Sequence, residues 1–428
     1  MPRNVRHLTV DHARGHIGAR CLQPSATTGS VGLECEWHVV RVGDPCAVVP
    51  LDELRGRLDA LGPLPGGSTV TYEPGGQLEL SGPALDGAAA AVHAMSADLH
   101  AVRDDLAAFD IALVGTGVDT LRPPQRLLRA PRYDAMEAYF DRFGPNGRVM
   151  MTRTAAVQLN LDNGRDHNEI DVRWRRVHLL GPTLVAAFAN SPIVGGRPTG
   201  WRSTRLANWW AMDRSRTAPI GDDRAVADWP DAALDARVML VRTDDDRYRP
   251  MCEPLTFRDW IEHGHALGHP TLDDLDYHLT TLFPPVRPRG WLEIRYLDAL
   301  PDPWWSVAAA VTATLVDDPA VAAIAEHVAR PNAGRWMDAA RLALTDPLLG
   351  RAARALFDLA VDAMVRRGDD ELAESSWTYL DRWVARGRTH ADDLLDDLRD
   401  DSAEHRHVGH DGSGRFDVAA VQGARAWA

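Results

Sequence analysis

The chain has 428 residues, enough for one large domain or two to three average ones, and its 45% hydrophobic and 25% charged residues are typical of a protein with a buried core. A net charge of −14 gives no sign of a general nucleic-acid or membrane-surface binder. All 47 basic residues are arginine, which excludes a P-loop lysine, a pyridoxal-phosphate Schiff base and the strand lysine of protein kinases.

Four segments in the first 300 residues have the alternation and the β-branched or aromatic content of strands. We predict strands at 31–42, 69–80, 155–162 and 291–297. A Gly-Gly pair at 75–76 predicts a bend within the second. Between the strands, apolar residues recur every three or four positions, which predicts helices at 85–109, 133–143 and 169–189.

After Pro301 the sequence becomes a series of Ala-, Leu-, Asp- and Arg-rich helical segments punctuated by Pro or Gly. We predict helices at 304–316, 320–329, 337–344, 352–366, 372–385 and 391–398. This helical block, 301–400, is expected to pack outside the sheet as part of a single catalytic domain, 1–400. A polar tail, 401–428, is expected to be mobile.

Each predicted strand has one apolar face and one face of carboxylates and amides, because alternate side chains point to opposite sides. The polar faces carry Glu34 and Glu36, Gln77 and Glu79, Gln158 with Asn160 and Asp162, and Glu293 with Arg295. One such strand is explained by an antiparallel sheet with one solvated face. Four are harder to explain in this way, because a solvated face would also contain serine, threonine and several basic residues.

Clustered glutamates repel one another unless a cation compensates them. Mg²⁺, or alternatively Mn²⁺, suits carboxylate oxygens and leaves coordination positions open for phosphate. Glu73, which precedes the Gly-Gly bend, is a further candidate ligand. A sheet lined with glutamates and an arginine suits phosphoryl transfer, where positioning and charge neutralisation provide most of the catalysis.

The motifs on these strands resemble those of the plant-type glutamate–cysteine ligase family, and within it the actinobacterial branch of ergothioneine biosynthesis. They are GLECE at 32–36, EPGGQLELSG at 73–82, MTRT at 151–154, VQLNLD at 157–162, FANSP at 188–192, the Arg205/Trp209/Asp213/Arg216 pattern, and LEIRYLD at 292–298. These motifs follow one another in order over residues 31–300.

The resemblance implies an α+β fold of the glutamine-synthetase-like class, in which a mainly antiparallel, curled sheet forms an active-site funnel. It implies an ATP-dependent ligase that joins the γ-carboxylate of L-glutamate to the amine of L-cysteine through γ-glutamyl phosphate. ATP is then a co-substrate and Mg²⁺, or Mn²⁺, the metal. Two alternatives remain: a ligase that uses a different amine acceptor, and a non-catalytic nucleotide-binding relative.

The resemblance also assigns roles to individual residues. It implies metal ligands at Glu34, Glu36, Glu73, Glu79, Asn160 and Glu293. It implies catalytic roles for Arg295, Glu36 and Glu293. It implies substrate contacts from Arg205, Trp209, Arg216, Thr154 and Gln158.

The remaining features of the sequence predict where the protein acts. The four cysteines contain no CxxC pair, the first residues lack the apolar core of a signal peptide, and the apolar run near 307–316 is too short to cross a bilayer. We therefore expect a cytoplasmic protein whose partners are small molecules rather than nucleic acid or membrane. The sequence leaves the oligomeric state open and favours a monomer over an oligomer.

Overall fold

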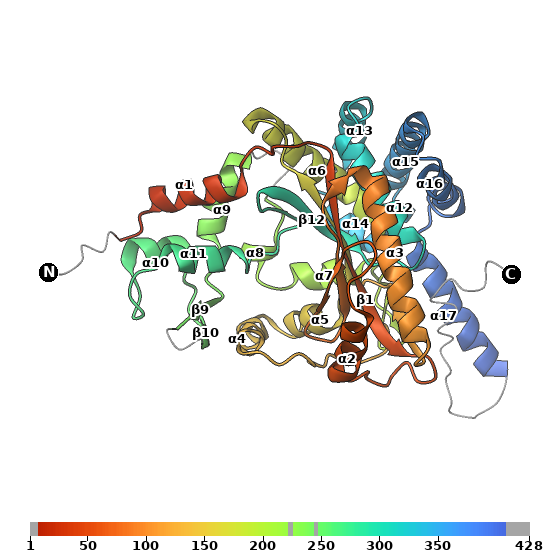
Figure 1. Cartoon of the computed structure of the whole chain (residues 1–428), viewed down its shortest axis with the longest axis horizontal. Helices are drawn as coiled ribbons and strands as arrows, with labels where there is room; N and C mark the ends of the chain where they lie inside the picture. Colours follow the sequence, from red (N-terminus) through yellow and green to blue (C-terminus); the bar gives the residue numbers. More distant parts are fainter. Residues whose placement is uncertain (1–6, 221–225, 244–246, 408–428) are drawn as a thin grey trace.

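The computed structural model describes residues 7–220, 226–243 and 247–407, with side chains up to residue 400. An eight-stranded antiparallel sheet lies at its centre, in the order β11-β12-β6-β1-β3-β2, with β4 and β5 also paired to β1 (Figure 1). Its strands are β1 Ser30–Arg41, β2 Thr69–Tyr72, β3 Leu78–Ser81, β4 Leu85–Asp86, β5 Ile111–Val114, β6 Ala156–Asp162, β11 Val286–Pro288 and β12 Trp291–Asp298. Two small hairpins pair β7 Ile193–Val194 with β8 Arg197–Pro198, and β9 Leu240–Arg242 with β10 Tyr248–Pro250.

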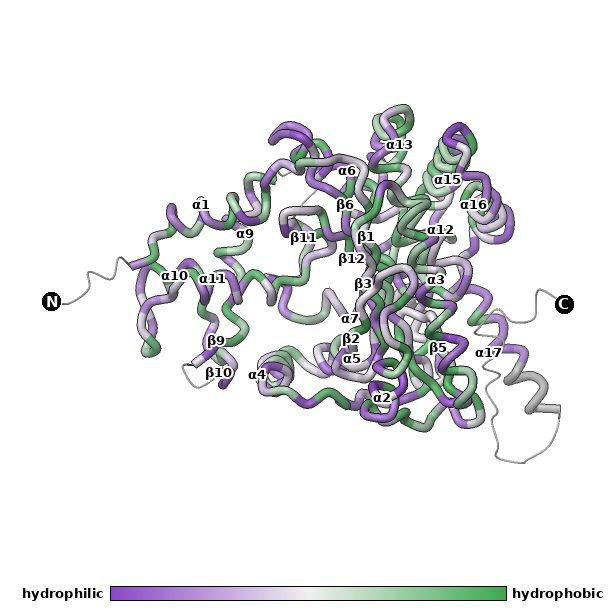
Figure 2. Tube along the Cα trace, in the orientation of Figure 1, coloured by the Kyte–Doolittle hydropathy of each residue, from purple (hydrophilic) through white to green (hydrophobic). Residues whose placement is uncertain are grey.

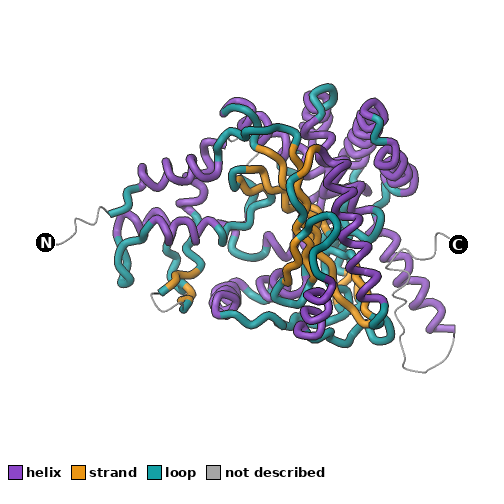
Figure 3. The backbone as a smooth tube through the Cα atoms, viewed as in Figure 1, coloured by secondary structure: helices purple, strands orange, loops and turns teal. Residues whose placement is uncertain are grey.

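Long helices cover the apolar face of this sheet. Three of them contact it directly, namely α3 Gly87–Ala107, α6 His167–Ala187 and α12 Trp304–Asp317. The rest of the helical block comprises α13 Ala322–Ala329, α14 Trp336–Leu342, α15 Pro347–Arg367, α16 Asp370–Arg382 and α17 His390–His407. Figure 3 shows these helices gathered on one side of the strands, and Figure 2 shows hydrophobic residues concentrated between the two layers. The predicted block outside the sheet is confirmed.

The apolar strand positions explain this packing. Leu33, Leu159 and Ile294 alternate with the polar residues of β1, β6 and β12, and each is almost completely buried. Burying one such side chain contributes about 2 kcal/mol relative to leaving it in water. The alternation therefore fixes which face of the sheet meets the helices and which faces away from them.

Shorter elements surround the opposite, polar face. These are α1 Val10–Cys21, α4 Pro131–Phe140, α5 Asn146–Arg153, α7 Thr204–Trp210, α8 Arg214–Thr217, α9 Trp229–Asp235, α10 Phe257–His263 and α11 Leu272–Leu279, and α2 Leu51–Leu61 packs beside α3. Single 3-10 turns occur at Asp141–Phe143, Val226–Asp228, Arg330–Asn332, Ala343–Thr345 and Val384–Arg386. In Figure 1, α1, α9, α10 and α11 extend away from the sheet as a separate group of helices.

The α+β class and the antiparallel sheet are confirmed, and most predicted elements differ from the observed ones by a few residues. The segment 69–80 differs more, because it forms two strands, β2 and β3, joined by a turn at 73–77. Helix α17 continues past residue 400 to His407, so the helix does not end where the tail was expected to begin. Residues 408–428 of that expected tail lie outside the described residues.

Across the described ranges, no single helix is both long and apolar enough to cross a membrane. Helix α12 and the following segment 322–332 meet the length and composition criteria only as a pair bent by 105°. Most of α12 is buried between the sheet and the outer helices, which accounts for its apolar composition.

Candidate active site

A cavity of about 270 Å³ lies over the polar face of the sheet. Three kinds of side chain line it. The carboxylates are Glu34, Glu36, Glu73, Glu79 and Glu293; the guanidinium groups are Arg132, Arg205, Arg287, Arg289 and Arg295. A third group, which we call the apolar wall, consists of Met136, Met150, Met151, Trp209 and Phe283. Acidic, basic and apolar surfaces therefore meet in one small volume.

Three of the glutamates form a compact group that can hold a metal ion. Glu36 of β1 lies directly opposite Glu79 of β3, and Glu73 approaches from the turn between β2 and β3. Carboxylate oxygens of the three lie within 4.8 Å of one another. Like charges directly opposite on neighbouring strands are destabilising, so this arrangement favours a bound cation.

The electrostatics of the group agree with a cation site. Burial raises the pKa of Glu36 well above its usual value, and the neighbouring Glu73 and Glu79 add to the shift. Burial, followed by the charge of Glu79, raises the pKa of Glu73 to about 7. A divalent cation would stabilise the ionised forms of these carboxylates, and the donor set, three carboxylates, is the one hard cations prefer.

Hydrogen bonds from β6 hold two of the acids in place. The amide of Gln158 donates to Glu36 Oε1 at 2.8 Å, and the backbone N–H of Ala156 donates to Glu36 Oε2 at 3.0 Å. Asn160 donates to Glu34 Oε1 at 2.8 Å and accepts from the Trp291 indole at 2.9 Å. Asn160 does not line the cavity and orients Glu34, and its expected role as a metal ligand stays a prediction.

Arginines surround Glu293, and its expected role as a metal ligand stays a prediction. Arg287 binds both of its oxygens, at 2.5 and 3.0 Å, while Arg289 lies at 3.1 Å and Arg295 at 3.2 Å. Burial opposes ionisation, but Arg287 and Arg295 hold the pKa of Glu293 well below its usual range. Glu293 is therefore an anionic anchor for the arginine side of the cavity.

Arg205 of α7 is buried at the edge of the cavity, with only 2% of its side chain exposed. Its Nη2 donates to the backbone carbonyl of Arg295 at 2.8 Å, and its Nη1 lies 3.8 Å from Asp298. Its Nε and Nη1 have no hydrogen-bond partner among the described residues. A buried guanidinium with unused donors is suited to binding an anionic group.

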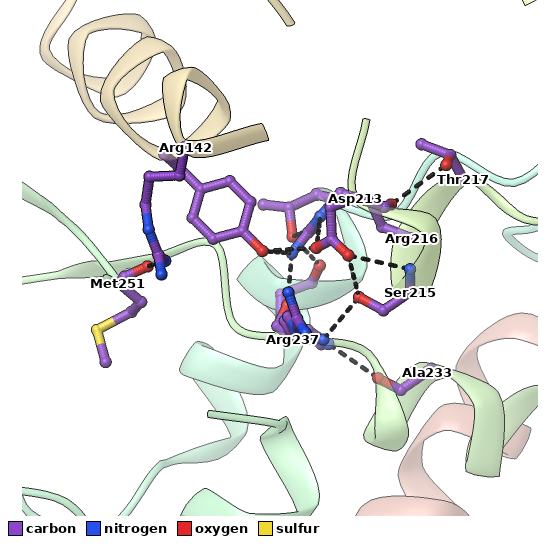
Figure 4. A network of polar contacts seen from close by, with 11 residues as sticks. Arg142, Asp213, Ser215, Arg216, Thr217, Ala233, Arg237 and Met251 are labelled. Carbon is purple, nitrogen blue, oxygen red and sulfur yellow. Dashed lines mark hydrogen bonds and ion pairs between the residues drawn. The ribbon is translucent and has the colours of Figure 1, made fainter. Parts of the chain in front are cut away.

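The other expected substrate contacts divide into two groups. Trp209, Thr154 and Gln158 line the cavity as expected. Arg216 does not line it: its side chain is completely buried in the polar network of Figure 4. There it pairs with Asp213 at 3.0 Å and donates to the carbonyl of Thr281 at 2.7 Å. Its donors are used inside the protein, so the structure places it behind the site and not in contact with substrate.

Several lining residues were missed from the sequence. Arg132 and Tyr133 start α4, Thr280 and Phe283 lie on the loop after α11, and Arg287 lies on the edge strand β11. None of them lies on a strand where carboxylates alternate with apolar residues, and that alternation is the pattern that indicates the site in the sequence. The cluster of arginines near 287–295 was the one hint available, since Arg287 and Arg289 alternate across a short segment.

The turn that carries Glu73 depends on glycine. A Cβ at Gly75 would overlap the backbone carbonyl of Thr152, and Gly76 has φ of +84°. We expect Gly75→Ala to destabilise the protein by at least about 2 kcal/mol and to lower activity, because the turn must move away from α5. Thermal unfolding followed by circular dichroism measures the first effect.

Gly56→Ala is the matched control for this substitution. Gly56 lies in helix α2, and a Cβ there would meet nothing within 4 Å. Alanine should stabilise that helix by up to about 1 kcal/mol. An unfolding temperature for Gly75→Ala equal to that of the wild type would contradict the predicted close approach.

Comparison with known proteins agrees with this geometry. A solved bifunctional glutathione synthetase from Pasteurella multocida shares the fold, with a TM-score of 0.52 and 14% identity over 97% of this chain and 54% of that one. Glutamate–cysteine ligase EgtA of Mycolicibacterium smegmatis is 45% identical over 400 residues, and that of Mycobacterium tuberculosis 42% over 403, each covering 92% of both chains. The chloroplastic glutamate–cysteine ligase of Arabidopsis thaliana is 31% identical over 77% of this chain and 66% of its own.

Its sequence relatives place the chain in the class of ATP-dependent ligases, and the fold and the cavity agree with that class. A family model described as glutamate-cysteine ligase family 2 (GCS2) matches residues 30–413, nearly the whole chain. The chain belongs to glutamate–cysteine ligase family 2.

Proposed function

We propose that the protein joins L-glutamate to L-cysteine at the expense of ATP, giving γ-glutamylcysteine, ADP and phosphate, as a first step of ergothioneine biosynthesis in the cytoplasm. One observation carries the proposal: the carboxylates of Glu36, Glu73 and Glu79 line the same cavity as a set of arginines. A cation and a polyphosphate require these two surfaces side by side.

The reaction proceeds in two steps. An oxygen of the glutamate γ-carboxylate attacks the γ-phosphorus of ATP, forming γ-glutamyl phosphate and releasing ADP. The cysteine amine then attacks the acyl carbon, the C–O bond to phosphate breaks, and the amine loses a proton as the amide forms. No side-chain nucleophile is needed, so the protein contributes binding, orientation and charge stabilisation.

The carboxylates of Glu36, Glu73 and Glu79, which we call the acidic group, form the proposed metal site. Glu36, Glu73 and Glu79 would hold Mg²⁺, or Mn²⁺, with Glu34 close enough to share the charge. The bound ion would neutralise phosphate oxygens and so reduce their repulsion of an incoming carboxylate. Gln158 and Asn160 keep the carboxylates of Glu36 and Glu34 turned toward the cavity.

The arginine and apolar surfaces suit the other parts of the substrates. Arg295 and Arg287, held by Glu293, present guanidinium groups to the transferred phosphoryl group. Arg205, whose Nε and Nη1 have no hydrogen-bond partner in the described part of the chain, is suited to the α-carboxylate of glutamate, which would leave the γ-carboxylate for ATP. The apolar wall, rich in methionine sulfur and aromatic surface, suits the small thiol side chain of cysteine.

A coupled assay of ADP release tests the proposal. With glutamate, ATP and Mg²⁺ present, single amino acids are added in turn as amine acceptors. Saturable turnover that depends on cysteine is expected. Turnover that is indifferent to cysteine but depends on another amine would indicate a different acceptor. Nucleotide binding without any turnover would indicate a non-catalytic relative.

A second measurement tests the charge repulsion within the acidic group and does not depend on turnover. Glu73→Gln should raise the unfolding temperature of the metal-free protein by about 2 °C, because one of three close carboxylates loses its charge. Mg²⁺ should then stabilise this variant less than it stabilises the wild type. Differential scanning fluorimetry with and without Mg²⁺ measures both effects.

The control is Glu262→Gln, on the exposed surface of α10. It should leave both the metal-free unfolding temperature and its response to Mg²⁺ at wild-type values. Equal stabilisation of Glu73→Gln and wild type by Mg²⁺ would argue against Glu73 as part of the metal site.

A further inference from the structure

We infer that the buried Arg216 is a positioning residue that holds the apolar wall of the cavity in place, and that its contacts set the affinity for the amino-acid acceptor rather than for ATP. Only the second claim, on the affinity for the amino-acid acceptor, rests on the proposed function. The side chain of Arg216 does not line the cavity, so it acts on the lining through Phe283 and Trp209.

Arg216 joins segments that are far apart in the sequence. Its Nε donates to Asp213 Oδ2 at 3.0 Å, its Nη1 to the carbonyl of Thr281 at 2.7 Å and to the Thr281 hydroxyl at 3.1 Å, and its Nη2 to the carbonyl of Arg237 at 2.5 Å. The Tyr139 hydroxyl of α4 completes the network by donating to Asp213 Oδ2 at 2.5 Å. Figure 4 shows these polar groups converging between helices.

The same residue reaches the cavity through the backbone. The N–H of Phe283 donates to the carbonyl of Arg216 at 2.8 Å, and the Trp209 indole donates to the carbonyl of Phe283 at 2.8 Å. The rings of Trp209 and Phe283 meet edge to face, with centroids 6.2 Å apart. The loop 280–283 and one side of the apolar wall are therefore fixed from behind by Arg216.

Burial of a charged group has to be compensated, and Asp213 is the compensating charge. Burial opposes its ionisation, but Arg216 holds the pKa of Asp213 below its usual value, whereas burial raises that of Tyr139 to about 12. The pair therefore remains an ion pair at neutral pH, with a neutral phenol beside it. A planar guanidinium is required, because a lysine ammonium cannot reach Asp213, Thr281 and Arg237 together.

Two variants test the inference. Tyr139→Phe removes only a hydroxyl group, and Arg216→Lys retains the charge but not the planar fork. Each should raise the KM for cysteine at least tenfold while changing the KM for ATP less than twofold. In hydrogen-exchange mass spectrometry, peptides covering 279–286 should exchange faster in both variants, and peptides covering β6 should not change.

Arg142→Gln is the matched control. Arg142 also ties the α4 region to the 237–251 segment, through the carbonyl of Met251 at 3.2 Å (Figure 4), but among the described residues no hydrogen bond or ion pair joins it to Asp213 or Arg216. It should behave as wild type in both measurements.

Unchanged exchange at 279–286 in both Tyr139→Phe and Arg216→Lys overturns the inference, whatever their activity. Faster exchange with equal changes in both KM values would overturn the assignment to the acceptor. A wild-type enzyme without cysteine-dependent ADP release would refute the proposed function, while the exchange data still decide the positioning role.

Discussion

Replacing Arg295 with methionine is expected to lower kcat by at least about 10³-fold while leaving the protein folded. Arg295 lies on β12, lines the cavity and is close enough to Glu293, Glu34 and Glu36 for their charges to act on it. Its Nε is buried and has no hydrogen-bond partner among the described residues, so it is available to a substrate oxygen. Losing a donor that acts on transition-state charge reduces rates by this order.

The fold should tolerate the change because Glu293 keeps two other arginines. Arg287 remains bound to both of its oxygens, and Arg289 to one. Steady-state ADP release gives kcat. A second variant, Arg295→Lys, separates the effect of charge from that of shape. It should recover only part of the lost rate, because an ammonium cannot bind an anion bidentately. A kcat of the methionine variant within tenfold of the wild-type value would show that Arg295 is not a catalytic residue.

Replacing Glu36 with glutamine is expected to reduce kcat/KM by about 10³-fold without reducing stability. Glu36 is the member of the acidic group that lies on the central strand β1, opposite Glu79 and hydrogen-bonded to Gln158. Neutralising it would weaken the proposed metal site but would also remove repulsion among three neighbouring carboxylates. Activity and stability should therefore change in opposite directions, as is common for functional sites.

Two measurements check this separation. The unfolding temperature of metal-free Glu36→Gln should equal or exceed that of wild type, and the Mg²⁺ concentration needed for half-maximal activity should rise. A matched loss of stability and activity would mean that Glu36 is a structural residue instead. Glu34→Gln offers an internal comparison, because burial and the charge of Glu293 raise the pKa of Glu34 but it lies outside the three-carboxylate group.

The strands of the site could be predicted because a buried sheet enforces strict alternation. Glu34, Glu36, Glu79, Glu293 and Arg295 were all found on polar strand faces, and all five line the cavity. Alternation identifies the shared face of a strand without knowledge of its neighbours. It cannot identify the partner of each side chain, so it did not indicate that arginines surround Glu293.

The contributions from loops and short helices could not be predicted in this way. Arg205 and Arg216 occur eleven positions apart in one polar segment, and nothing in that segment indicates that one faces the cavity and the other the protein interior. The orientation of Arg205 depends on Asp298, and that of Arg216 depends on Thr281. Both partners come from strand and loop segments that are distant in the sequence. Tertiary contacts of this kind have no local sequence signature.

The position of β6 in the sheet has a consequence for synthesis on the ribosome. β6 pairs with β1 on one edge and with β12 on the other, and β12 ends only at Asp298. Until that part of the chain has emerged, one edge of β6 has no strand to pair with, and the glutamates of β1 lack the guanidinium group of Arg295. The nascent protein thus combines high contact order with a transiently open sheet edge, a state that favours chaperone binding and intermolecular pairing until β12 is in place.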